Sequence, residues 1–132
     1  MNSIFGVPLS GLQAQSKRLA VSAENVANVS SQGVRPDQAA TDTEGFVPHR
    51  VLATAAVDGG VQTERVPVSP AAVLAYDPGA PDADAQGLVA RPNVSLEEEA
   101  VIQLQAKRVY QANLKVVQAL DQMLGNLLDV RS

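Results

Sequence analysis

The sequence has no cysteine and no tryptophan, and only two phenylalanines and two tyrosines among its 132 residues. Without cysteine the chain forms no disulfide, no thiolate metal site and no cysteine nucleophile. Large aromatic side chains bury the most surface in a core, and here alanine and valine supply most of the apolar residues. The composition therefore favours thin, repetitive packing over one large core. The length allows a single domain, or one domain with an insertion.

Basic charge is also scarce. Ten lysines and arginines face fourteen acidic residues, which gives a net charge of −4. A nucleic-acid binder needs a basic face, and an anionic membrane attracts a basic amphipathic helix, so we expect neither a nucleic-acid partner nor direct membrane insertion. No apolar run approaches the ~18 residues that cross a bilayer.

The first residues do not have the pattern of a cleaved secretory signal. The segment 1–8 carries no basic residue and no long apolar run, and the first basic residues are Lys17 and Arg18. We therefore expect that any export of this protein uses a route that does not read such a signal.

A heptad repeat predicts a helix over about residues 4–29, with Pro8 near its start, where proline is tolerated. The repeat ends in a turn cluster at 28–33, which is followed by Pro36. Packing supplies most of the stability of a helix of this length, so we expect it to need a partner. The residues of the repeat are Phe5, Leu9, Leu12, Ser16, Leu19, Ala23 and Val26.

A stronger repeat predicts a second helix from Ser95 onward. Ser95 and Glu98 have the spacing of a capping box, with Glu98 reaching back to the start of the helix. Glu97, Glu98 and Glu99 in the first turn complement the helix dipole. The heptad positions are Ile102, Ala106, Val109, Asn113, Val116, Leu120, Met123, Leu127 and Val130.

The apolar stripe of this second helix is wider than the first helix can cover, because Tyr110, Val117 and Leu124 add a further row. Further partners are therefore expected, although the repeat alone also fits a buried pair in an ordinary helical bundle. Asn113 at a heptad position either fixes the register of the pair or lies where the stripe turns toward solvent.

Between the helices, residues 46–68 predict a β-hairpin. Apolar residues alternate along 47–57, and Asp58-Gly59-Gly60 supplies the turn. An isolated hairpin is barely stable, so this one needs a surface to lie on. The segment 69–94 is rich in proline and glycine and has no periodicity, which is typical of a functional or disordered loop.

No residue pattern predicts catalysis, a cofactor or a metal centre. His49 is the sole histidine and has no nucleophile or second ligand near it in sequence. Asp82 and Asp84 resemble the start of a calcium loop, but the twelfth position is Asn93 instead of glutamate, which favours a solvated turn or interface loop. We therefore expect a protein that is not an enzyme.

These observations predict a mainly α fold with a small β insertion. Residues 1–30 form the N-terminal helix of a helical core and residues 95–132 form its C-terminal helix. Residues 31–94 form the inserted hairpin, loop and extended interface segment. The two helices are expected to pair in a coiled-coil-like layer.

Three segments resemble the flagellar rod and hook axial proteins. The stretch 25–33, Asn-Val-Ala-Asn-Val-Ser-Ser-Gln-Gly, resembles the element that ends the first helix in this family. The stretch 110–113, Tyr-Gln-Ala-Asn, resembles a second family element. The loop 76–94 looks like that of the proximal-rod C-type branch, and the resemblance covers essentially the whole chain.

The resemblance implies a structural subunit of the basal-body rod, the shaft that crosses the periplasm and carries motor torque. It implies helical assembly with itself and with other rod subunits, export unfolded by the flagellar type III apparatus without a cleaved signal, and contact with the basal-body base. We expect Leu9, Leu12, Leu19 and Val26 to meet Val109, Val116, Leu120 and Met123. The other expected interface residues are Asn28, Gly33, Tyr76, Pro78, Asn93, Tyr110 and Asn113.

A hypothesis from another class is a soluble helical adaptor or chaperone that binds one partner through its heptad helices. Such a protein would be a stable helical monomer or dimer in the absence of rod proteins.

Overall fold

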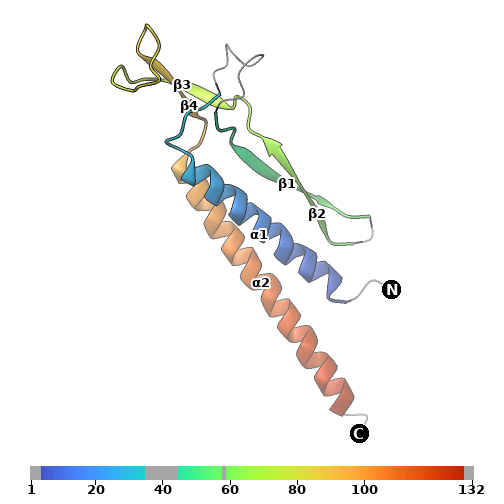
Figure 1. Cartoon of the computed structure of the whole chain (residues 1–132). Helices are drawn as coiled ribbons and strands as arrows, with labels where there is room; N and C mark the ends of the chain where they lie inside the picture. The colour runs from blue at the N-terminus through green and yellow to red at the C-terminus, as the bar shows by residue number, and fades with distance from the viewer. Residues whose placement is uncertain (1–3, 35–44, 58, 130–132) are drawn as a thin grey trace.

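A computed structural model describes residues 4–34, 45–57 and 59–129 of the chain (Figure 1). Two long helices from opposite ends of the sequence lie side by side, and antiparallel strands come between them in sequence. This confirms the prediction of a mainly α fold with a small β insertion. The elements are α1 (Gly6–Ala27), β1 (His49–Ala55), β2 (Val61–Pro67), β3 (Ala72–Tyr76), β4 (Leu88–Pro92) and α2 (Leu96–Asp129).

The predicted start of α2 is confirmed, but the capping partners differ from the prediction. The backbone N–H of Glu98 donates to Oγ of Ser95 at 3.3 Å. The carboxylate that contacts Ser95 is that of Glu97 and not that of Glu98, because the Ser95 hydroxyl donates to Oε2 of Glu97 at 3.0 Å. A hydrogen bond from its own backbone N–H, and then the bond from Ser95, lower the pKa of Glu97 below its ordinary value.

The helix pair is antiparallel, and its interface is built from small and polar residues. Ala14 of α1 and Ala106 of α2 are both almost fully buried. The contacts run from Gly11 opposite Asn113 at one end to Asn25 opposite Glu99 at the other. Continuing this register, α1 begins opposite about residue 118, so α2 extends past it (Figure 1). We call residues 120–129 the α2 overhang.

The overhang should be the least protected part of α2 in the isolated protein, because α1 does not reach it. We expect its amide hydrogens to exchange at least tenfold faster than those of residues 99–113. Hydrogen exchange of a verified monomer measures this difference. Equal protection along all of α2 would show that the isolated chain covers the overhang in some other way.

The predicted hairpin is confirmed as the β1–β2 ribbon, which lies along α1 on the side away from α2 (Figure 1). Its turn is held where the N–H of Val61 donates to Oγ of Ser10 at 3.0 Å. Nearer its base, Arg65 forms an ion pair with Glu24 at 2.9 Å. The alternation predicted from sequence is seen at His49 and Val51, which are half-buried while Arg50 and Leu52 are exposed.

The segment 69–94 contains a second hairpin that the sequence analysis did not predict. β3 and β4 pair antiparallel over five residues each, with Tyr76 opposite Leu88. Three of the four prolines in this segment lie outside the strands, and Pro92 is the last residue of β4. The prolines therefore obscure the strand pattern in the sequence but do not interrupt the hydrogen bonds between β3 and β4. Oδ1 of Asp84 accepts hydrogen bonds from the N–H groups of Gln86 and Leu88 and so shapes the loop.

Gly33 joins the β3–β4 ribbon to the rest of the chain. Its N–H donates to the carbonyl of Ala90 at 2.9 Å, and it is bridged to Phe46. A Cβ at this position would stand 2.8 Å from the backbone carbon of Arg91 and 2.9 Å from Cβ of Ala72. Only glycine allows this close approach between the two backbones.

Neither helix, over the residues that the structure describes, combines the length and apolar character that a membrane crossing requires.

Candidate assembly surfaces

The leucines of the first heptad repeat do not form the contact between the helices. Leu9 and Leu19 are 51% and 45% exposed, and neither is among the buried residues of α1. Val109, Val116 and Met123 of α2 are exposed as well. The structure therefore does not bring Leu9 and Leu19 against these three residues within the chain. The physical reason is that small residues let the two backbones approach closely, which leaves the larger side chains at the edges. The buried residues of α1 are Pro8, Gly11, Ala14, Gln15, Val21, Ser22 and Asn25.

A long apolar groove runs along one edge of the helix pair. Leu19 of α1 and Leu104, Tyr110 and Leu114 of α2 line its larger part, which has a volume of about 800 Å³. Leu9 and Leu12 continue it past Tyr110. We call this surface the α1–α2 groove. The first heptad repeat thus lines an open groove instead of a closed seam.

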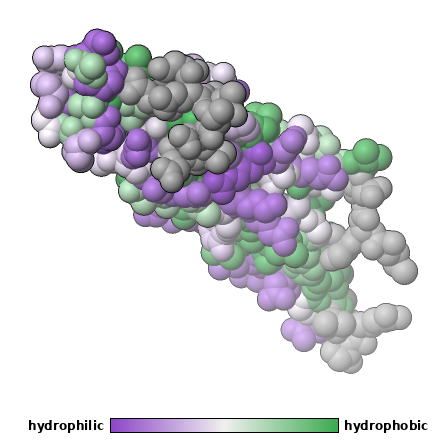
Figure 2. Space-filling model, turned by 45° about the horizontal axis from the view of Figure 1, so that its top comes forward, coloured by the Kyte–Doolittle hydropathy of each residue, from purple (hydrophilic) through white to green (hydrophobic). Residues whose placement is uncertain are grey.

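The main heptad row of α2 forms a second apolar surface. Ile102, Val109, Val116 and Met123 are spaced seven residues apart, and their exposure rises along the helix from 37% to 57%. Ile102 lines a pocket with β1 on the side of α2 away from Leu104 and Leu114. The helix pair therefore presents apolar side chains along both of its edges, and Figure 2 shows hydrophobic surface toward the end of the molecule where α2 terminates.

Asn113 is half-buried and lies against α1. A Cβ built at Gly11 would stand 2.7 Å from Nδ2 of Asn113, so the amide fills the space that glycine leaves. The sequence left two roles open for Asn113, and this contact favours the one in which it fixes the register of the helix pair. The contact places a polar side chain of α2 against a glycine of α1.

Asn25 is a residue that the sequence analysis did not single out and that joins three elements of the fold. Its Nδ2 donates to the carbonyl of His49 and to Oε1 of Glu99, both at 2.7 Å, and its Oδ1 accepts from the N–H of His49 at 3.1 Å. One buried side chain thus joins α1, β1 and the first turn of α2. Asn25 is the first residue of the stretch 25–33 that carries the family resemblance. That resemblance is the feature of the sequence from which its importance could have been predicted.

Further polar contacts surround this residue. Gln103 donates to Oγ of Ser22 at 3.1 Å, and Ser22 contacts the carbonyl of Glu99 at 3.4 Å. Oε2 of Glu99 is buried without a hydrogen-bond partner. Buried polar networks of this kind specify one arrangement of elements more than they add net stability.

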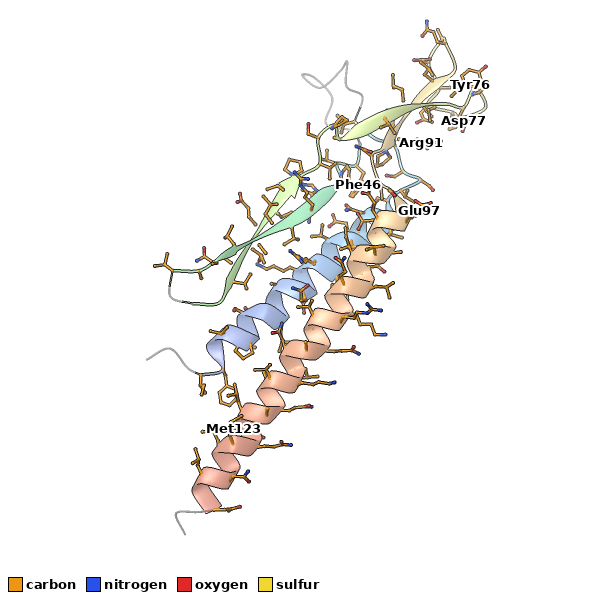
Figure 3. The ribbon with its side chains drawn as sticks, turned by 180° about the vertical axis from the view of Figure 1, so that it is seen from behind. Phe46, Tyr76, Asp77, Arg91, Glu97 and Met123 are labelled. Carbon is orange, nitrogen blue, oxygen red and sulfur yellow. The ribbon has the colours of Figure 1, made fainter. Side chains whose placement is uncertain are left out.

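The remaining predicted interface residues divide into three groups. Asn28, Gly33 and Asn93 make contacts within the chain: Asn28 donates to the carbonyl of Glu24 at 2.8 Å and Asn93 to that of Pro70 at 3.0 Å. Tyr76 and Pro78 are exposed, and Tyr76 lies at the far end of the β3–β4 ribbon (Figure 3). Val26 and Leu120 are half-buried.

Two residues that the sequence analysis considered as possible reactive or metal-binding groups, His49 and Asp84, are engaged in structural contacts. Arg65 donates to Nδ1 of His49 at 3.0 Å, and since arginine can only donate, this nitrogen is the acceptor. Asp84 binds backbone amides of its own loop. Across residues 4–34, 45–57 and 59–129, no group of three or more histidine or acidic side chains lies close enough to hold a metal ion.

The fold and its surfaces define a class: a helix-pair structural protein whose two terminal helices expose apolar edges and whose central segment projects as β-ribbons. Comparison with known proteins agrees with this class. Residues 7–33 match the family described as flagella basal body rod protein, and residues 85–130 match the family described as flagellar basal body rod FlgEFG protein C-terminal.

Whole-chain relatives are similarly named. The flagellar basal-body rod protein FlgC of Salmonella typhimurium is 40% identical over 123 residues, which cover 92% of this chain and 91% of that protein. FlgC of Agrobacterium fabrum is 35% identical over 130 residues, covering 92% and 88%. FlgC of Bacillus subtilis is 40% identical over 57 residues, covering 43% and 38%.

The chain therefore belongs to the flagellar basal-body rod protein family, and within it to the FlgC type. It is a structural subunit of the rod, and its place is the flagellar basal body. Membership of this family confirms the resemblance found in the sequence. It also implies assembly with other rod subunits.

Proposed function

We propose that this chain assembles helically in the proximal rod, with itself and with other axial subunits, and transmits motor torque through its helix pair. The observation that carries this proposal is the pair of exposed apolar edges on the helices. Apolar rows of this length on one small protein mark interaction surfaces, because isolated soluble proteins rarely expose them. In an assembly, neighbouring subunits cover them.

The finer parts of the proposal follow from the same features. The interface residues are those that remain exposed or half-buried: Leu9, Leu12, Leu19, Val26, Tyr76, Pro78, Val109, Tyr110, Val116, Leu120 and Met123. Asn113 sets the register of the helix pair that presents them. The protein acts without catalysis or cofactor. It is exported by the type III apparatus, contacts the basal-body base and spans the periplasm as part of the rod.

The test is to locate the protein in isolated hook–basal bodies from cells that carry a tagged copy. We expect it in the rod fraction in a fixed ratio to the other rod subunits. An adaptor or chaperone would instead be recovered as a soluble monomer or as a complex with one partner. That recovery, with none in the basal bodies, would overturn the proposal.

We expect replacement of Tyr76 by alanine to weaken assembly while changing the free energy of unfolding of the monomer by no more than ~0.5 kcal/mol. The side chain is 74% exposed at the tip of a ribbon, so the monomer loses little packing. Aromatic residues of this kind often anchor interfaces. Urea unfolding of the monomer and the amount of protein in basal bodies measure the two effects. An early unfolding transition with normal assembly would assign Tyr76 to the monomer fold.

A further inference from the structure

We infer that the α2 overhang of one copy of this chain docks in the α1–α2 groove of a second copy. This inference rests on the proposed rod function and names a self-contact that would be used within it. Its evidence is the match between these two surfaces in apolar character, length and charge.

The overhang is an amphipathic helix end that extends past α1. Leu120, Met123, Leu124 and Leu127 have the spacing i, i+3, i+4 and i+7 and so form one continuous stripe. Leu127 is 67% exposed and Met123, which Figure 3 places on the part of α2 beyond α1, is 57% exposed. This stripe needs an apolar surface of another molecule.

The groove has the size of one such helix end. It extends along α1 from Leu9 to Leu19, which at ~1.5 Å per residue is about 15 Å. The overhang spans about 14 Å by the same rise. Leucines of both helices, two alanines and Tyr110 form the apolar part of the groove wall, beside polar side chains such as those of three glutamines. This apolar part is the counterpart of the leucines and methionine of the stripe.

The charges beside the two surfaces are opposite. Lys107 lines the larger part of the groove and Lys17 its continuation. Asp121 lies on the overhang beside the apolar stripe. Within the described residues none of these three side chains forms an ion pair. A docked overhang would bring the carboxylate of Asp121 toward the ammonium groups of the groove.

A second copy is the occupant because one chain carries both halves of the contact. The overhang and the groove are different surfaces, so the contact is head-to-tail and does not close on itself in a dimer. Repetition of the contact would propagate along an assembly. This is the geometry that an open helical rod requires.

The experiment uses disulfide cross-linking, which is clean because the parent chain has no cysteine. Three double variants combine Leu127→Cys with Leu12→Cys, with Leu19→Cys or with Val109→Cys. Val109 is the matched control, because it is 43% exposed against 45% for Leu19 and lies on the opposite edge of the helix pair. Each variant is expressed in place of the native chain, basal bodies are isolated and oxidised, and dimers are measured on a denaturing gel.

We expect a dimer band from Leu127→Cys with one of the two groove positions, at least fivefold stronger than with Val109→Cys. The groove position that reacts gives the direction in which the overhang lies. Adding Asp121→Lys should lower the yield severalfold, and a further Lys107→Asp should restore it. Variants that are incorporated but cross-link equally from Val109, or not at all, would overturn this docking and leave the rod function intact. Absence of the cysteine-free parent from basal bodies would overturn the rod function and this inference with it.

Discussion

We expect replacement of Asn25 by alanine to lower the free energy of unfolding by about 2–4 kcal/mol. The change removes three hydrogen bonds that join α1 to β1 and to the start of α2. Each neutral bond contributes about 0.5–1.5 kcal/mol and a bond to a charged group about 1.5–3 kcal/mol. It also leaves the carboxylate of Glu99 buried with neither oxygen paired by a side chain. For a small domain this is a large part of the total stability.

The measurement is urea unfolding followed by circular dichroism, with Asn28→Ala as the matched control. Asn28 lies three residues later in the same sequence element, and its side chain donates only to the carbonyl of Glu24 in its own helix. Losing this local contact should cost about 1 kcal/mol. Equal effects from the two alanine variants would show that Asn25 does not join the three elements in solution.

Replacement of Val116 by aspartate should abolish swimming while leaving the monomer folded. Val116 is 48% exposed, so the charge stays hydrated in the isolated chain and its free energy of unfolding changes by no more than ~0.5 kcal/mol. In the assembled rod this row is proposed to be covered. A carboxylate buried there without a partner costs several kcal/mol, which is enough to prevent incorporation.

Gln118→Asp is the control, because it adds the same charge two residues away, on the opposite side of α2, at an exposed position. Swimming is measured in a deletion strain that carries each variant, and the exported protein is measured in parallel to separate loss of export from loss of assembly. Normal swimming by the Val116→Asp strain would show that this heptad row is not an interface.

The sequence was informative where local patterns decide the structure. The heptad repeats gave both helices, and α2 begins after Ser95 as its cap predicted. The Asp-Gly-Gly turn predicted the β1–β2 ribbon, in which Ala55 pairs with Val61 on either side of that turn. It was less informative for β3 and β4, because five-residue strands between prolines carry little periodicity.

The interface between the helices shows why apolar periodicity was misleading. The repeat of Leu9, Leu12 and Leu19 is real, but it faces outward into a groove. The contact is instead made by Gly11, Ala14 and Ser22, whose small side chains allow the backbones to approach. A pattern rule that ranks residues by hydrophobicity gives these positions little weight.

The sequence by itself determined the identity of this protein as a rod subunit and the kind and order of most of its elements, because turns, caps and heptads are set by neighbours along the chain. Only the tertiary structure decided which face of each helix is inside, how Asn25 and Gly33 join segments far apart in sequence, and that α2 extends past α1. These depend on close approach between backbones and on the pairing of buried polar groups, and one chain's sequence does not encode either as a local pattern.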